Sequence, residues 1–232
     1  MSTRMTLTRI ATIAAVVVLP LFGTSAPAAA QTGSTQKIGA EFWQWALSIP
    51  ADVNPLIDPT GASCMVGQRG SSWYLAGFLF GGSAARACSI PAGTALVFPV
   101  LNSINFDTPN VCGQGSTRLT VAELRASSAA LINDASTLTV MLDGKVVTEI
   151  ERVRSRVFPL TLPENNVFDP FCADFGGFPG GVYPRAVDEG YYVKLDALSP
   201  GTHTLRIQAT APTFGVDLDV TYNLTVVPGD TN

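Results

Sequence analysis

The stretch Val216-Asp-Leu-Asp-Val-Thr-Tyr-Asn-Leu-Thr-Val-Val227 decides the fold class of this chain. Its apolar side chains recur at every second position, which is the period of a β-strand with one face toward a hydrophobic core. Asp, Thr and Asn occupy the positions between them, so we expect the opposite face to meet water. Residues 202–209 alternate in the same way. The end of the chain is therefore predicted to form two closing strands.

Further strands and two short helices are expected upstream of this pair. Asp143-Gly144 is a preferred hairpin turn between alternating segments at 137–142 and 146–150. Other strands are predicted at 73–80, 94–101, 153–157 and 191–195, and helices at 38–47 and from the capping box Thr120-Val-Ala-Glu123 to Asn133. Many short strands separated by turns indicate a mainly β protein, an antiparallel β-sandwich of the jelly-roll or immunoglobulin-like type with two short helices.

The composition excludes several classes of protein. The chain has 232 residues, of which 47% are hydrophobic and 14% charged, and its formal net charge is −4. Low charge with high apolar content is the reverse of a disordered composition. Since acidic residues outnumber basic ones, no surplus of cations exists to bind nucleic acid or an anionic membrane surface. The single histidine excludes a His-rich metal site.

Residues 1–30 have the pattern of a secretory signal peptide. Arg4 and Arg9 precede an apolar run at 11–22, and Ala28-Ala29-Ala30 offers a cleavage site. The run is shorter than the roughly 20 residues that span a bilayer, so no membrane span is expected in the mature protein. We interpret 31–37 as a polar lead-in, 38–227 as a single β-sandwich domain and 228–232 as a polar tail. The protein is expected to be secreted, to the periplasm or to the medium.

The four cysteines indicate two disulfides in an exported protein, and three pairings are open. We favour Cys64–Cys88, because these residues bracket one glycine-rich unit, and Cys112–Cys172, because these residues join two turn-rich loops. No Cys-x-x-Cys spacing occurs, so no metal site is predicted. Carboxylate and amide oxygens on the irregular segments make calcium the one candidate cofactor.

Aromatic residues in a glycine-rich loop give the leading functional hypothesis. Phe175, Phe178 and Tyr183 lie in the irregular segment 164–183, which cannot be packed throughout. We expect these rings to be exposed, where flat surfaces stack on sugars or on apolar ligands. The sequence therefore favours a binding domain, whose partner is a carbohydrate or another envelope or extracellular protein.

Two alternatives stay open. A secreted glycoside-type hydrolase needs two carboxylates beside the scissile bond. The loop candidates are Asp58, Asp107, Glu164, Asp169, Asp174, Asp188 and Glu189. A Ser-His-Asp triad has only His203 available, which we interpret as a strand residue. The third interpretation is a structural secreted subunit. Because no recognised catalytic constellation is present in the sequence, binding is favoured over catalysis.

Several stretches resemble a group of exported bacterial proteins of uncharacterised activity. They are Gly67-Gln-Arg-Gly-Ser-Ser-Trp-Tyr-Leu-Ala-Gly77, Arg86-Ala-Cys-Ser-Ile-Pro-Ala-Gly93 and Phe98-Pro-Val-Leu-Asn102, with shorter pieces at 142–144, 186–191 and 198–205. The resemblance spans nearly all of the mature chain and implies one domain. If the group shares a site, the first candidates are the polar residues beside these apolar strands, Gln68, Arg69, Arg86, Asn102 and Asn105. Each can equally satisfy buried backbone groups.

Overall fold

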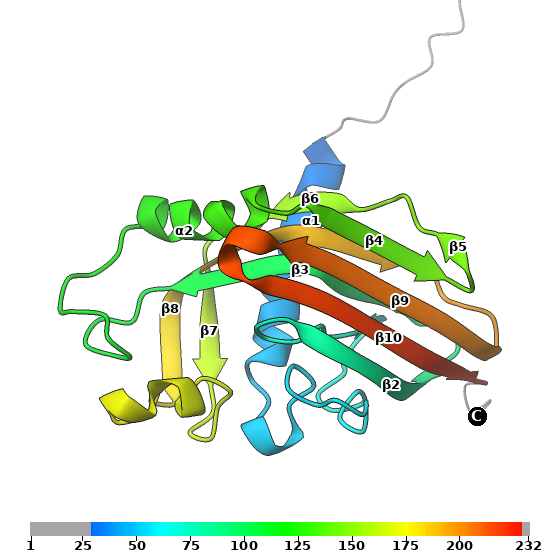
Figure 1. Ribbon diagram of the computed structural model, residues 1–232, viewed down its shortest axis with the longest axis horizontal. Coiled ribbons are helices and arrows are strands. Elements are labelled where there is room, and N and C mark those ends of the chain that lie inside the picture. The colour runs from blue at the N-terminus through cyan, green and yellow to red at the C-terminus, as the bar shows by residue number, and fades with distance from the viewer. Residues whose placement is uncertain (1–28, 229–232) are drawn as a thin grey trace, which may run out of the picture.

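The computed structural model describes residues 29–228, so the predicted signal peptide and polar tail lie almost entirely outside the described residues. The described chain is mainly β, with two mixed sheets arranged as a sandwich (Figure 1). The first sheet contains β1 (Ser72–Tyr74), β3 (Ala95–Phe106), β6 (Glu151–Arg154), β7 (Phe158–Leu162) and β8 (Gly181–Leu195). The second contains β2 (Gly82–Pro91), β4 (Thr137–Leu142), β5 (Lys145–Val146), β9 (Gly201–Ala211) and β10 (Val216–Val227).

Helices α1 (Ala29–Ala46) and α2 (Val121–Asn133) and the short 3₁₀ turns Ala51–Val53, Asp169–Phe175 and Pro212–Phe214 complete the fold. One core lies between the sheets, where Phe98, Val193 and Val220 pack together. A second core lies on the outer face of the first sheet, where Phe42 of α1 packs near Tyr192 of β8. Figure 1 shows α1 crossing behind that sheet. The molecule therefore has three layers, with the first sheet in the middle.

The two closing strands are confirmed. β9 and β10 pair antiparallel over their length, and the alternate positions Leu218, Val220 and Tyr222 are buried. On the other face Asp219 forms an ion pair with Arg206 at 2.6 Å. Burial thus follows the period-two pattern, because one face of the strand fills the core and the other meets water.

The sheets are mixed, so the prediction of an antiparallel sandwich is wrong for two strand pairs. β1 pairs parallel with β3, and β2 pairs parallel with β10 from Gly82 to Pro91. Alternation of side chains is the same in both kinds of pairing, so the pattern carries no information on direction. A hairpin turn fixes the relative direction of two strands only when they are consecutive in the chain. Neither of these two pairs is consecutive, so no turn fixes its direction.

Strands β2 and β7 were not predicted, and several element boundaries also differ from the prediction. The apolar segment 73–80 is a strand only as far as Tyr74, and residues 75–81 leave the sheet. α1 begins at Ala29, so the predicted polar lead-in 31–37 is helical. β8 begins at Gly181, ten residues before the strand predicted at 191–195. Its central residues 186–190 are buried without alternation because α1 packs on one face of β8 and α2 on the other, which hides the strand period.

The local motifs are confirmed. The Thr120 N–H donates to Glu123 Oε2 at 2.7 Å and the Glu123 N–H donates to Thr120 Oγ1 at 3.2 Å, which completes the capping box of α2. Both disulfides have the favoured pairing, Cys64–Cys88 and Cys112–Cys172. Within residues 29–228, none of the helices has the length and apolar run needed to cross a membrane.

Removal of either disulfide should lower the free energy of unfolding, since the bond restricts the unfolded chain. Replacing Cys112 and Cys172 by Ala opens a loop with a sequence separation of 60, for which the chain-entropy relation gives a loss of about 4 kcal/mol. The corresponding loss for Cys64 and Cys88, with a separation of 24, is about 3 kcal/mol. Urea denaturation of both double variants measures these losses. Unchanged stability in both would contradict the assignment of a structural role to the bonds.

Candidate functional site

A pocket lies at the edge of the first sheet, where β3 continues beyond its short neighbour. β1 pairs only with residues 95–97, whereas β3 runs on to Phe106. Segment 75–81 crosses this open edge, and its residues 77–81 line a partly open cavity of about 260 Å³. Its walls come from α1 (Phe42, Trp43), from segment 77–81, from residues 99–102 of β3 and from Val216 and Leu218 of β10. The early end of β1 therefore creates the space that the pocket occupies.

The rim of the pocket carries exposed aromatic rings. Phe80 is 58% exposed and Phe214 is 48% exposed, and both line the cavity. Phe171 is 57% exposed and packs edge-to-face against Phe80, with ring centroids 4.6 Å apart. Large apolar side chains grouped at the surface around a cavity are typical of a ligand-binding site.

Arg86 holds the pocket-forming segment from inside the sandwich. It is 1% exposed, and Nη1 donates to Ala76 O at 2.6 Å, to Gly77 O at 3.3 Å and to the Tyr222 hydroxyl at 2.8 Å. The guanidinium also lies over the ring of Phe78, 4.5 Å from its centroid. Hydrogen bonds from a buried cation to backbone carbonyls are strong, so Arg86 fixes the path of the segment. Its Nε and Nη2 have no hydrogen-bond partner among the described residues.

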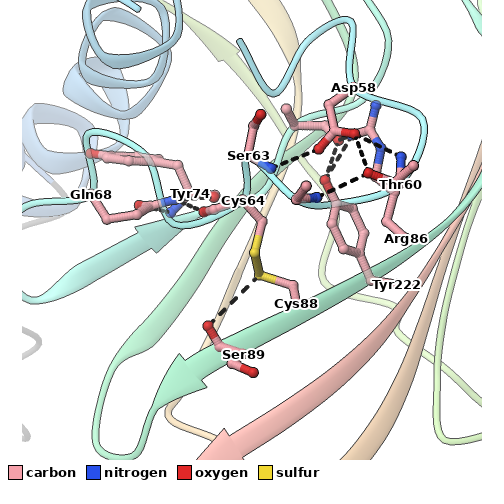
Figure 2. The surroundings of a disulfide bond; sticks show 12 residues. Asp58, Thr60, Ser63, Cys64, Gln68, Tyr74, Arg86, Cys88, Ser89 and Tyr222 are labelled. Carbon is pink, nitrogen blue, oxygen red and sulfur yellow. Dashed lines mark hydrogen bonds between the residues drawn. A yellow bond between two sulfur atoms is a disulfide. The ribbon is translucent and has the colours of Figure 1, made fainter. Parts of the chain in front are cut away.

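The loop 58–64, which a disulfide joins to β2, covers Arg86 at the free edge of that strand (Figure 2). The Ala87 N–H donates to Thr60 O at 2.9 Å, and the Cys64–Cys88 disulfide fixes the other end of the loop. Inside the loop, Asp58 accepts from the N–H groups of Thr60 and Ser63. Burial raises the pKa of Asp58, but these hydrogen bonds outweigh it and the pKa is lowered. The loop thus pairs part of an edge strand that would otherwise be open.

A buried carboxyl lies on the other side of the pocket. Asp188 is 0% exposed, and its Oδ1 accepts from Trp43 Nε1 at 2.8 Å and from the Tyr192 hydroxyl at 2.9 Å. The Tyr192 oxygen in turn accepts from Asn102 Nδ2 at 3.0 Å. Trp43 and Asn102 both line the cavity, so the carboxyl is linked to the pocket wall at two points. Burial raises the pKa of Asp188 to about 7, although hydrogen bonds from Trp43 and Tyr192 lower it.

The next residue has the opposite environment. Glu189 lies 2.6 Å from Arg152 Nη2 and 3.1 Å from Arg154 Nε. Consecutive residues of a strand point to opposite faces, so Glu189 turns toward this arginine pair of β6 and away from Asp188. The two acids therefore do not form a carboxylate pair.

Two of the five polar candidates belong to the pocket. Asn102 lines it and Arg86 supports it from behind. Gln68 instead donates to Cys64 O and Tyr74 O and accepts from the Tyr74 N–H, so it satisfies backbone groups.

The remaining two candidates lie elsewhere. Asn105 donates to Ser103 Oγ and Ser128 Oγ between β3 and α2. Arg69 is exposed at the surface, outside the cavity lining.

The aromatic loop is less exposed than predicted. Phe175 is 63% exposed, as expected, but Phe178 is 6% exposed and the expectation for it is wrong. Tyr183 is half-buried against Phe106 and Phe178. These rings form an aromatic cluster under the loop, which the glycine-rich sequence concealed because it has no periodicity. The sequence did not identify the rim rings, because Phe80 ends the apolar segment predicted as a strand at 73–80 and Phe214 is a single apolar residue beside a glycine.

Among the other acidic candidates, Glu164 and Asp174 are exposed, and Asp169 Oδ1 accepts from the Phe178 N–H at 2.6 Å. Asp107 is ion-paired with Arg118 at 3.2 Å and with Arg185. Burial raises its pKa, but hydrogen bonds from Gln114, the Leu119 N–H and Arg185 outweigh this and lower the pKa to about 2. His203 binds Asp143 at 2.7 Å near the surface, and this contact raises the pKa of the imidazole. No group of three His, Cys, Asp or Glu side chains among the described residues is placed to hold a metal ion.

Comparisons with protein-family models, with curated proteins and with solved structures find no match for this chain.

The pH dependence of stability should carry the signature of Asp188. Its pKa is about 7 in the folded protein against an ordinary value of 3.8, so the folded state binds the proton more tightly than the unfolded chain. The stability that protonated Asp188 contributes to the folded state is therefore fully present at low pH and is lost as the pH rises toward 7. Asp188→Asn remains neutral and should gain stability relative to the native protein by up to roughly 1.4 kcal/mol per pH unit between about pH 4.5 and 6.5.

Urea denaturation across this range measures the difference, and Asp107→Asn is the matched control. The lowered pKa of Asp107 places its titration below the range, so the stability difference of the control should be independent of pH there. If the stability difference between Asp188→Asn and the native protein is also independent of pH, the assignment of a buried, proton-binding carboxyl is contradicted.

Proposed function

We propose that the protein is an exported binding domain that holds a small apolar ligand in the pocket of segment 77–81. The observation that carries the proposal is an apolar cavity of about 260 Å³ whose rim includes the exposed rings of Phe80 and Phe214. Exposed aromatic surface is unfavourable in water, and a ligand that covers it gains free energy in proportion to the apolar area removed from water. Concave apolar sites with few polar groups are the usual form of small-molecule sites.

The volume sets the size of the ligand. A dry apolar cavity of about 150 Å³ binds benzene, and pockets for drug-sized molecules begin near 300 Å³. By proportion, the cavity here suits a molecule of about ten non-hydrogen atoms. This size corresponds to one substituted ring or one short chain.

The chemistry of the walls favours an apolar ligand over a carbohydrate. Apart from the indole of Trp43, whose N–H is bound to Asp188, the only polar side chain in the lining is that of Asn102. A sugar has many hydroxyl groups, each of which loses hydrogen bonds to water when it enters a site without partners. A single amide cannot replace them.

An exported location is supported by the leader-like pattern of residues 1–30 and by the two disulfides, because such bonds persist in oxidising compartments. The resemblance to exported bacterial proteins supports the same location.

Within the sandwich class, the strand order favours the immunoglobulin-like alternative over the jelly roll. The first sheet has the order β1-β3-β8-β6 and the second β2-β10-β9-β4-β5. Without the additional strand β2, these orders correspond to A-B-E-D and G-F-C-C′ of immunoglobulin sandwiches. The parallel pairing of β1 with β3 and the two helices are departures from that plan. The pocket lies beside the parallel pairing of β1 with β3.

Filling the pocket should abolish ligand binding. Val216 lines the cavity at its mouth, and Val216→Trp places an indole there. Toluene is the probe, because its size fits the cavity and its binding needs no polar contact. In NMR titrations it should shift the signals of residues 77–81 in the native protein, and these shifts should disappear in the variant.

Val146→Trp is the matched control, since Val146 is 65% exposed on β5, outside the lining. It should bind toluene as the native protein does. A second comparison sets Phe80→Ala against Phe175→Ala, two exposed rings of which only Phe80 lines the cavity. Weaker binding in Phe175→Ala alone would place the ligand at the glycine-rich loop and contradict the proposal.

A further inference from the structure

The hydrogen bonds beside the pocket run in one direction. An indole N–H only donates, so Asp188 Oδ1 accepts from Trp43 at 2.8 Å. The Tyr192 hydroxyl lies 2.9 Å from the same oxygen, and its proton must point toward it. This direction holds for the ionised carboxyl, whose oxygens only accept hydrogen bonds.

The direction of these hydrogen bonds fixes the orientation of the Asn102 amide. With its proton given to Asp188, the Tyr192 oxygen can only accept, and it accepts from Asn102 Nδ2 at 3.0 Å. The reversed amide would place two acceptor oxygens against each other. The oxygen Oδ1 of Asn102 is thus directed away from Tyr192, and no described residue donates a hydrogen bond to it. Asn102 is half-buried in the cavity lining, so Oδ1 is the side-chain acceptor that the wall offers to a ligand.

On the basis of the proposed function, we infer that the ligand is an uncharged apolar molecule with one hydroxyl or N–H donor, which binds Asn102 Oδ1. An apolar ligand without a donor leaves this oxygen without a partner when it displaces water. A carboxylate brings negative charge toward Oδ1 and toward Asp188, and an ammonium group loses its hydration among aromatic walls. Neutral alcohols and amides avoid both costs.

Two glycines make this arrangement sterically feasible. A Cβ at Gly190 would lie 2.6 Å from Asn102 Cβ, and a Cβ at Gly39 would lie 1.9 Å from Asp188 Oδ2. Gly190 is the register partner of Asn102 across β3 and β8, so its missing side chain leaves room for the amide. Gly39 allows α1 to reach the carboxyl. Tyr192 and Asp188 act as positioning residues, whereas Asn102 touches the ligand.

The test compares three neutral probes of similar size on the full mature chain at pH 8.5, where Asp188 is ionised, by NMR titration or calorimetry. Toluene has no polar group, benzyl alcohol has a hydroxyl donor, and benzyl methyl ether has an acceptor but no donor. We expect benzyl alcohol to bind about tenfold more tightly than the ether.

The Asn102→Leu variant should remove the preference for the alcohol and leave toluene binding within about twofold. Asn105→Leu is the matched control, because it removes an amide from the same strand outside the cavity, and the preference should persist. Tyr192→Phe leaves the Asn102 amide free to turn, so it should reduce the alcohol-to-ether ratio while toluene still binds. A residue with a merely structural role would not change this ratio.

The outcomes separate the two proposals. If toluene does not bind the native protein, the proposed function is wrong. If toluene binds but the ether equals or exceeds the alcohol, or if Asn102→Leu keeps the preference, the inference is overturned and the proposed function stands. Should Asn102→Leu fail to fold, the native alcohol-to-ether ratio and its change in Tyr192→Phe decide the question.

Discussion

The buried guanidinium of Arg86 is the interaction on which the pocket depends. A cation with a hydrophobic surround is costly unless its N–H groups find acceptors, and here the acceptors include two carbonyls of the segment that leaves the sheet. The carbonyls gain partners that a β-ladder would otherwise supply. The segment is therefore held away from β3, and the space between them becomes a cavity. Phe78 shields the cation from that cavity with its ring.

The carboxyl of Asp188 plays the corresponding part on the opposite wall. It joins α1 to β8 through Trp43 and Tyr192 and so fixes the helix that closes the outer side of the pocket. Both walls thus combine apolar side chains that face the cavity with one buried polar group behind them. Such groups have few alternative partners, so they specify one arrangement of a core that apolar contacts alone would leave adjustable. A preformed pocket binds with less loss of conformational entropy than one that must first be ordered.

Features encoded by neighbouring residues could be predicted from the sequence, and features that depend on distant contacts could not. The period of β10, the capping box at Thr120 and the turn at Asp143-Gly144 are local, and all are confirmed. The parallel pairing of β2 with β10 has no local signal. Arg86 and Asn102 were recognised as polar residues beside apolar strands, but their partners lie in segments that only the folded chain brings together. The sequence places Asp188 among the candidate hydrolase carboxylates on irregular segments, whereas in the fold it lies on β8 and is fully buried.

The most direct test of this account is a crystal structure of the protein under xenon pressure, since xenon enters dry apolar cavities of this size. The account predicts xenon density between Phe42, Phe78 and Leu218, with the hydrogen bonds from Arg86 to the carbonyls of residues 76 and 77 intact. A cavity closed by a rotated Phe78, or filled by ordered water at the same place, would contradict the claim that the fold maintains a preformed apolar site.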